Sequence, residues 1–137
     1  MKSTESRVNL PLTLPRSVIL RGKRNFQRLF REGSVLTEQH VSLRYVIFAD
    51  DSEDTLIGFV TGRRIGKAHE RNLVRRRLKE SYRLNQHMLT EALQAGKPGF
   101  HAAFIAKSAR ADFSTLQQEC MGLLKRLKAK LKQHHNV

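Results

Sequence analysis

The stretch RIGKAHERNLVRRRLKESYR, residues 64–83, contains one of the densest basic runs of the chain. Wound as a helix at about 100° per residue, it divides into two neighbouring faces. One face suits packing against a sheet and carries Val74, Leu78, Ser81 and Tyr82. The other, which we call the donor face, is a continuous row of hydrogen-bond donors: Asn72, Arg75, Arg76, Lys79 and Arg83. The stretch therefore predicts a helix that packs along one side and presents cations along the next.

The charge of this region is high for its length. Residues 63–83 carry a net charge of +7, which is half of the +14 of the whole chain. Arg71, Arg75 and Lys79 are spaced by four and repel one another along the helix. A bound polyanion would supply the missing counter-charge, and nucleic acid is the leading one. The charge alone leaves open a solvated basic face and an anionic membrane surface, although the chain lacks an amphipathic face rich in Trp and Phe.

Upstream of the basic helix, the sequence predicts a short helix and a group of strands. A helix is predicted over residues 23–32, since two phenylalanines and Leu29 recur at helical spacing before a glycine stop. Residues 41–48 alternate as a strand does, and residues 55–62 form a second strand that is expected to pair with the first across an acidic hairpin turn. A further short strand is predicted over residues 34–37.

Downstream, residues 68–90 lack Gly and Pro and are predicted to be helical. Residues 95–99 form a turn, and residues 100–107 are an apolar run of strand length. The last helix is predicted to begin at Ser114, because Gln117 three residues later completes a capping-box pattern. The order of helix, strands, helix, strand and helix predicts an α+β fold in which helices pack on one small sheet.

The ends of the chain and its single cysteine indicate the domain limits and the cellular compartment. Residues 1–19 hold two of the three prolines and no clear hydrophobic period, which predicts an extended arm. The chain has neither a signal-peptide core nor the roughly 18 to 20 apolar residues of a membrane span. Cys120 cannot form an intramolecular disulfide, which fits a reducing compartment. We expect a cytoplasmic protein without membrane association, with one domain at residues 20–133 and a flexible tail at 134–137.

Few residues of the chain suit catalysis. The carboxylate cluster at residues 50–54 lies in the predicted turn, and a solvated turn explains it more simply than a Mg²⁺ site does. The six histidines are scattered, and Cys120 falls on the apolar face of the last helix. The segment TGRRIGK lacks the spacing and the Lys-Ser/Thr pair of a phosphate-binding P-loop. We therefore predict no catalytic residue and no metal or cofactor bound by the protein alone.

The basic helix and its flanks resemble the bacterial ribonuclease P protein subunit. The signature helix of that family reads roughly R-N-x-x-K-R-x-x-R-E-x-[FY]-R, and this chain has Arg71-Asn72, Arg75-Arg76, Lys79-Glu80 and Tyr82-Arg83 at those places. RGKRNFQRLFREGS is similar to the family's first helix, LIGFVTGRRIGKA to its central strand and loop, and HAAFIAKSARADFSTLQQE to its last strand and helix. The family usually has Lys at position 75 and Arg at position 79, so this chain reverses both and keeps the charge. The resemblance covers residues 15–132.

This resemblance implies a fold and a function. The fold is a two-layer sandwich of a four-stranded mixed sheet and three helices in the order αβββαβα, with a rare left-handed βαβ crossover through the basic helix. The protein would pair with a large catalytic RNA that removes the 5′ leader from precursor tRNA. The residues implied to bind that RNA are Arg63, Arg64, Lys67, Arg71, Asn72, Arg75, Arg76, Lys79 and Arg83. Those implied to line a cleft for the single-stranded leader, by stacking and charge, are Arg24, Phe26, Phe30, Val41, Leu43 and Tyr45.

Several points stay open at the level of sequence. Periodicity alone assigns Phe26 and Phe30 to a core, and alternation does not say which side of the strand with Val41 faces outward. The charge and element order also fit a structural RNA-binding protein of ribosomal type with no role in tRNA processing. Under the resemblance, the RNA carries out the hydrolysis, the ribonucleoprotein requires Mg²⁺, and no protein partner is implied.

Overall fold

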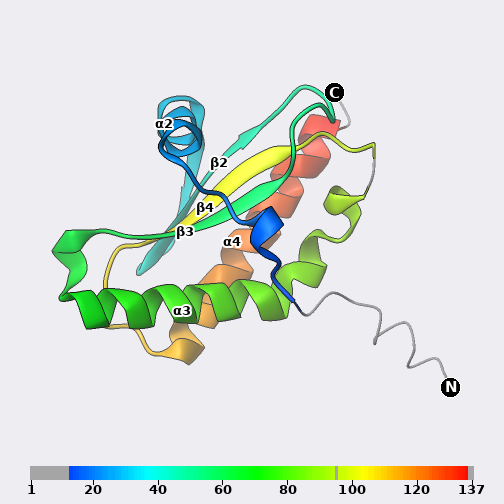
Figure 1. The fold of residues 1–137 in the computed structure, drawn as a ribbon. Coiled ribbons are helices and arrows are strands. Elements are labelled where there is room, and N and C mark those ends of the chain that lie inside the picture. Colours follow the sequence, from blue (N-terminus) through cyan, green and yellow to red (C-terminus); the bar gives the residue numbers. More distant parts are fainter. Residues whose placement is uncertain (1–12, 95, 136–137) are drawn as a thin grey trace, which may run out of the picture.

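The structure is a computed structural model that describes residues 13–94 and 96–135 (Figure 1). Its main elements are α2 (Lys23–Glu32), β1 (Ser34–Thr37), β2 (Val41–Ile47), β3 (Leu56–Thr61), α3 (Ala68–Asn85), β4 (Phe100–Ala106) and α4 (Phe113–His135). Short 3₁₀ helices connect them: η1 (Arg16–Val18), η2 (Arg63–Ile65), η3 (Gln86–Leu89) and η4 (Glu91–Leu93). The predicted α+β fold, with its order αβββαβα, is confirmed, including the short first strand.

The strands form one mixed sheet in the order β1-β2-β4-β3. β4 is antiparallel to β2, with Tyr45 opposite Ala102, and parallel to β3. The predicted hairpin between residues 41–48 and 55–62 is therefore wrong, because β4 lies between them. The run FHAAFIA of β4 is apolar and buried on nearly its whole length, which suits a strand flanked on both sides.

The acidic turn between β2 and β3 crosses the start of β4 instead of closing a hairpin. The N–H of Gly99 donates to the carbonyl oxygen of Asp50 at 3.0 Å, and the N–H of Phe48 donates to that of Gly99 at 2.9 Å. A Cβ on Gly99 would collide with the backbone carbonyl of Glu53. A glycine at this position thus lets the turn pass close over the strand.

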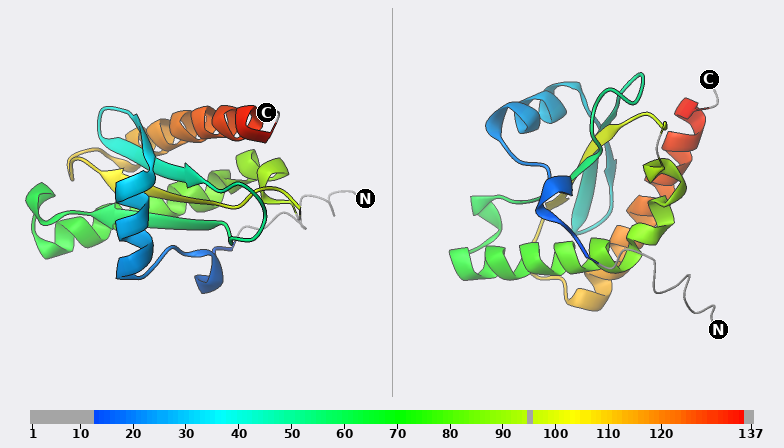
Figure 2. Two further views of the ribbon diagram at one scale, coloured as in Figure 1. Left: turned by 90° about the horizontal axis from the view of Figure 1, so that it is seen from above. Right: turned by 45° about the vertical axis from the view of Figure 1, so that its right-hand side comes forward.

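α3 and α4 cover one face of the sheet, and α2 lies across the other face (Figures 1 and 2). The connection from β3 through α3 to the parallel strand β4 is left-handed, as the view from above in Figure 2 shows. Strand twist disfavours this hand. The crossover is what places the basic helix beside α4 and opposite α2.

The main core lies between the sheet and the two helices α3 and α4. Phe104 of β4 is fully buried, and its ring centroid lies 6.0 Å from those of Phe59 and Tyr82. Tyr82 and Leu78 come from α3, so this aromatic cluster joins the basic helix to the sheet. The packing face predicted from the winding of the helix is confirmed.

β2 contributes Val41, Leu43 and Tyr45 to the same core, where each is at most 8% exposed. The prediction that these three residues line a surface cleft with Phe26 and Phe30 is wrong in this structure. Side chains alternate along a strand, and in β2 the alternation turns these three toward α4. Arg44 is on the opposite side of the strand, under α2.

α2 approaches the sheet closely over two small residues. Gly58 of β3 and Ala103 of β4 lie opposite each other in the register. A Cβ on Gly58 would lie 3.1 Å from the ring of Phe26 and 3.2 Å from Leu20. Leu20, Leu29 and Ala103 form a second, smaller core with Phe26 packed against it.

The start of α4 and the end of α3 differ from the prediction. α4 begins at Phe113 and is capped by Asp112, whose Oδ1 accepts the N–H of Thr115 at 2.8 Å. This hydrogen bond lowers the pKa of Asp112. The predicted cap at Ser114 is wrong, because Asp112 is an equally good N-cap placed earlier, and Ser114 falls inside the first turn. α3 ends at Asn85, and 3₁₀ turns replace the helix predicted up to residue 90.

Residues 13–19 of the predicted arm pack on the domain, and residues 1–12 lie outside the described residues. Ile19 forms a parallel bridge with Ile57 of β3. The side-chain amide of Gln86 donates to the carbonyl oxygen of Thr13 at 2.9 Å. The boundary expected at residue 19 therefore does not separate this segment from the sheet.

The predicted C-terminal tail is in part helical. α4 includes His134, whose ring Nε2 lies 3.1 Å from the carbonyl oxygen of Phe48. Residues 136–137 lie outside the described part of the chain. Among the helices described, none has the length and apolar composition needed to cross a membrane.

A buried histidine lies between the sheet and α2. His101 is 2% exposed, meets the ring of Phe48 edge-on at 4.9 Å, and its Nδ1 has no hydrogen-bond partner in the described chain. Burial lowers the pKa of His101 and the guanidinium of Arg28 lowers it further, while Glu53 and Asp54 act in the opposite direction. The folded protein therefore favours neutral His101.

We expect the free energy of unfolding to depend on this group. Since the folded-state pKa is below the unfolded value of about 6.5, stability is fully present above about pH 6.5 and is lost as the pH falls from there through the folded-state pKa. Urea unfolding at about pH 7.5 and about pH 5.5 measures this loss. The variant His101→Gln should lack this part of the pH dependence. If the unchanged protein and the variant lose the same free energy of unfolding between the two pH values, other groups cause the loss.

Candidate nucleic-acid interface

α3 presents the donor face at the surface of the protein. On its packed side, Val74, Leu78 and Tyr82 are at most 2% exposed. Burial raises the pKa of Tyr82 to about 12, so its phenol stays neutral. The exposed members of the donor face are Asn72, Arg76 and Lys79, and the half-buried ones are Arg75 and Arg83. The cations line one face of the helix, and the apolar groups on the neighbouring face hold the helix in the core.

Arg75 is held in place by two hydrogen bonds. Its Nη2 donates to Oγ1 of Thr61, at the end of β3, at 2.8 Å, and its Nη1 donates to Oδ1 of Asn72 at 3.0 Å. The guanidinium has further N–H groups that these two bonds do not use. A guanidinium held in one orientation loses less side-chain entropy when it binds an anion.

The start of α3 is closed by its own side chains. Oε1 of Glu70 accepts the backbone N–H of Lys67 at 2.7 Å, and Nη1 of Arg71 donates to the carbonyl oxygen of Gly66 at 2.9 Å. The N-terminus of α3 thus already carries a carboxylate. Arg71 fastens the loop before the helix, whereas the exposed cations next to it are Arg63, Arg64 and Lys67.

A basic cleft of about 610 Å³ lies between the donor face and the N-terminal segment. Its lining residues are Leu14, Arg16, Ile19, Arg21, Arg76, Lys79, Glu80 and Arg83. The five cations outnumber the single carboxylate, and walls of one charge concentrate the field in a cleft. Arg16 and Arg21 were missed by the sequence prediction, because only the fold of residues 13–21 beside α3 brings them here.

The cations of the cleft differ in how far they are already paired. Oε1 and Oε2 of Glu80 accept hydrogen bonds from Nε and Nη2 of Arg83 at 3.0 and 2.6 Å, which lowers the pKa of Glu80. Arg76 and Lys79 make no side-chain hydrogen bond or ion pair with any residue that the structure describes. On the donor face these two side chains are therefore the ones available to an external anion. Arg16 and Arg21, on the other side of the cleft, are likewise unengaged among the described residues.

A second surface lies where α2 crosses the sheet. Phe30 is 44% exposed, and the guanidinium carbon of Arg44 lies 5.1 Å from its ring centroid. Nη1 of Arg44 also donates to the carbonyl oxygen of Phe30 at 3.3 Å. The ring of Phe26 lies 6.4 Å from that of Phe30 but packs on Gly58, so Phe26 belongs mainly to the smaller core. Arg24 is exposed on the same helix.

The structure gives Phe26 and Phe30 different places, although the sequence left both open between core and surface cleft. Phe30 is a surface residue next to a cation, and Phe26 packs between α2 and the sheet. Arg44 was missed by the sequence prediction. Its alternation with Leu43 and Tyr45 places it on the other side of β2 from them, but only the tertiary fold shows that this side lies under α2.

Other reactive side chains are engaged in the fold. Cys120 is buried, and burial raises the pKa of its thiol to about 12. Asp50 of the acidic turn accepts the N–H of Ser52 at 2.9 Å, which lowers the pKa of Asp50. Over residues 13–94 and 96–135, no group of three or more His, Cys, Asp or Glu side chains is placed to hold a metal ion.

Comparison with known proteins gives consistent matches. A family model described as Ribonuclease P matches residues 14–128. The chain is 31% identical over 104 residues to the ribonuclease P protein component of Clostridioides difficile (strain 630), which covers 74% of this chain and 84% of that protein. It is 36% identical over 118 residues to that of Chlorobaculum tepidum, covering 80% of this chain and 74% of that protein.

Solved structures agree with these matches. The RNase P protein of Thermotoga maritima is similar with a TM-score of 0.62 and 28% identity, over 79% of this chain and 96% of that chain. An RNase P protein of Staphylococcus aureus has a TM-score of 0.66 at 15% identity, over 81% of this chain and 95% of that chain, which supports the fold alone. Residues 14–128, which the family model matches, include both the donor face and the surface around Phe30.

Proposed function

Because this chain belongs to the bacterial ribonuclease P protein family, we propose that its two cationic surfaces hold two different RNAs in one ribonucleoprotein. As a ribonuclease P protein component it takes part in tRNA processing and partners the ribonuclease P RNA. This assignment sets aside the alternative of a ribosomal-type protein without a role in tRNA processing. How the protein's residues divide the binding is the proposal that follows.

In this proposal the donor face binds the RNA subunit. The observation that carries it is the pair of unengaged cations, Arg76 and Lys79, beside the pre-oriented guanidinium of Arg75. The basic cleft lies between α3 and the N-terminal segment, so its cations could contact a phosphate backbone from both sides. Arg63, Arg64 and Lys67 extend the positive surface past the start of α3. Arg71 acts indirectly, by holding the loop that carries these three cations.

The surface around Phe30 is proposed to hold the 5′ leader of precursor tRNA. A single strand is bound without strict sequence readout when bases stack on aromatic rings and cations follow the backbone. Phe30 offers an exposed ring, and Arg44 lies close enough to contact a phosphate of a base stacked there. Arg24 adds charge on the same helix, and Phe26 fixes the position of α2 on the sheet.

The chemistry itself is proposed to belong to the RNA subunit. Burial keeps the thiol of Cys120 protonated and unreactive. Among the described residues, no three or more His, Cys, Asp or Glu side chains are grouped to hold a metal ion, so we derive no step through a protein-bound metal. The Mg²⁺ that the ribonucleoprotein requires would then be bound by RNA. The protein assists by neutralising phosphates and by positioning the leader, in the cytoplasm where precursor tRNA is made.

The leader assignment predicts a selective loss in one variant. Phe30→Ala should weaken binding of precursor tRNA to the ribonucleoprotein by about 5- to 150-fold, since a stacked base contributes roughly 1–3 kcal/mol. Binding of mature tRNA, which lacks the leader, should stay unchanged. Equilibrium binding of both tRNAs to the reconstituted ribonucleoprotein measures the two effects.

The matched control is Leu93→Ala, which removes a similarly exposed apolar side chain on η4, away from α2. This variant should bind both tRNAs as the unchanged protein does. Equal weakening of precursor and mature tRNA by Phe30→Ala would contradict the leader assignment while leaving the family assignment intact.

A further inference from the structure

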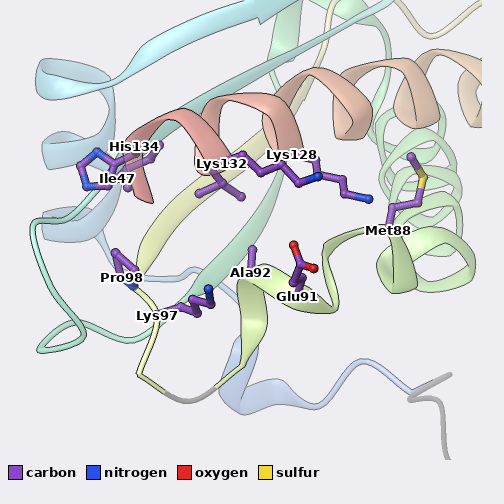
Figure 3. A pocket seen from close by; sticks show the side chains of 10 residues that line it. Ile47, Met88, Glu91, Ala92, Lys97, Pro98, Lys128, Lys132 and His134 are labelled. Carbon is purple, nitrogen blue, oxygen red and sulfur yellow. The ribbon is translucent and has the colours of Figure 1, made fainter. Parts of the chain in front are cut away.

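A second cavity, of about 280 Å³, lies between the C-terminal half of α4 and the segment that leads from α3 to β4 (Figure 3). Its apolar lining consists of Ile47, Met88, Ala92, Pro98 and Leu131. None of its lining residues belongs to the donor face or to the surface around Phe30. The hydrogen bond between His134 and the carbonyl oxygen of Phe48 fastens the end of α4 at the rim.

Charged side chains stand at the mouth of this cavity on opposite sides. Lys128 and Lys132 are one helical turn apart on α4, and Lys97 adds a third cation next to Pro98. Glu91 comes from η4, across from α4 in Figure 3. The side chains of Glu91, Lys128 and Lys132 make no hydrogen bond or ion pair with any other residue of the described chain.

This arrangement restricts the ligand that would fit. The apolar lining suits a flat or apolar body, and the lysines of α4 suit an anionic group held at the rim. Glu91 is exposed at the rim. It favours in addition a body with a hydrogen-bond donor, because a hydrocarbon body would displace water from the carboxylate without replacing its hydrogen bonds. A fatty acid satisfies the first two conditions but not the third.

We propose that this cavity binds one nucleotide whose base carries an exocyclic amino group, with the base against the apolar lining and the phosphate at Lys128 and Lys132. The volume, about 280 Å³, is just below the roughly 300–1,000 Å³ of small-molecule sites, so the base enters and the sugar-phosphate stays at the rim. The N4 amino group of cytosine donates a hydrogen bond to the carboxylate of Glu91, as it does to carboxylates in base recognition. Uracil presents the O4 acceptor there, which the carboxylate repels.

The test uses the full chain without RNA and follows backbone amide NMR signals during titration at constant ionic strength. Cytidine 5′-monophosphate should shift signals of residues 88–92 and 128–134 and reach saturation. Uridine 5′-monophosphate should bind about fivefold or more weakly, given the usual discrimination by a base contact. Inorganic phosphate should bind more weakly than either nucleotide. Equal binding of all three, or shifts confined to the donor face, would overturn the proposal.

Three variants distinguish binding inside the cavity from non-specific attraction to its positive charge. Ala92→Leu fills the cavity without changing the charge and should abolish the binding of cytidine 5′-monophosphate. Glu91→Gln, whose amide can also donate to uracil O4, should remove the preference for cytosine. Lys130→Gln, on α4 but outside the lining, should change neither. Unchanged binding by Ala92→Leu, with an unchanged circular dichroism spectrum, would overturn the proposal.

One further comparison tells whether the site takes a nucleotide of an RNA strand or a free nucleotide. The dinucleotide CpA should bind more tightly than cytidine 5′-monophosphate if the site takes an unstacked residue of an RNA strand, and less tightly if it takes a free nucleotide. Both results support a nucleotide site. The measurements need no ribonuclease P RNA, so their failure would not bear on the function proposed above.

Discussion

Replacing Arg76 and Lys79 together by glutamine is expected to weaken binding to the ribonuclease P RNA by about 10- to 100-fold at moderate salt. Each residue contributes one cation that is unengaged within the described chain. Because salt screens contacts at an exposed surface, each cation is expected to contribute about 0.7–1.4 kcal/mol, which is less than the roughly 1.5–3 kcal/mol of a well-formed hydrogen bond to a charged group. The slope of log affinity against log salt should also become shallower, by roughly one for each lost phosphate contact. Filter binding over a range of salt concentrations measures both quantities.

The control for this prediction removes the same charge elsewhere. Lys125 and Lys130 are exposed on α4, far along the chain from the donor face, and lysine and glutamine have similar helix propensity. The variant Lys125→Gln with Lys130→Gln should lose much less affinity than the donor-face variant. If the two double variants lose affinity equally, net charge rather than the donor face accounts for RNA binding.

The variant Phe104→Ala is expected to lower the free energy of unfolding by about 3–5 kcal/mol. The ring is fully buried between Phe59, which stacks on it at 9° between planes, and Tyr82 of α3. Its removal opens a cavity at the place where the basic helix joins the sheet. A domain with a total stability of about 5–15 kcal/mol would lose a large share of it, as denaturant unfolding would show.

The conservative variant Phe104→Leu keeps most of the apolar volume and should lose clearly less stability than Phe104→Ala. We also expect RNA binding by Phe104→Ala to recover at low temperature, where the folded fraction is larger, because the donor face itself is unchanged. A loss of under about 1 kcal/mol for Phe104→Ala would mean that the two-sided packing of β4 contributes little.

The features of α3 that follow from its own sequence were predictable. The 3.6-residue period separates Val74 and Leu78 from Arg75 and Arg76, and no distant contact is needed to obtain that separation. The roles of the individual arginines were not predictable in the same way. Arg75 is fixed by Thr61 and Arg71 by Gly66, and both contacts depend on how β3 and the loop after it approach the helix.

The order of the strands was beyond the local pattern. Residues 41–48 and 55–62 have the alternation and the acidic turn of a hairpin, yet β4 takes the place between them. Which strands pair depends on burial across the whole sheet. The left-handed crossover was predicted from the resemblance to a family and not from periodicity. The same non-local choice decides that Val41 of β2 faces α4 and Arg44 faces α2.

The cap of α4 also depends on contacts that the local sequence pattern does not show. Ser114 and Gln117 form an acceptable capping pattern, and Asp112 is an equally acceptable cap placed two residues earlier. Only the path of the chain out of β4 selects the aspartate. The surface prediction for Phe26 and Phe30 was likewise resolved by tertiary contact, since Gly58 lets Phe26 sink into the sheet while Phe30 stays exposed.

The most direct test of the central claim is cleavage of a precursor tRNA by the cognate ribonuclease P RNA, with and without this protein, at low Mg²⁺ and near-physiological salt. If the protein serves as the ribonuclease P subunit and holds the leader, its addition should lower the Mg²⁺ concentration needed for cleavage and tighten precursor binding relative to mature tRNA. An unchanged Mg²⁺ requirement, together with equal affinity for precursor and mature tRNA, would contradict the account.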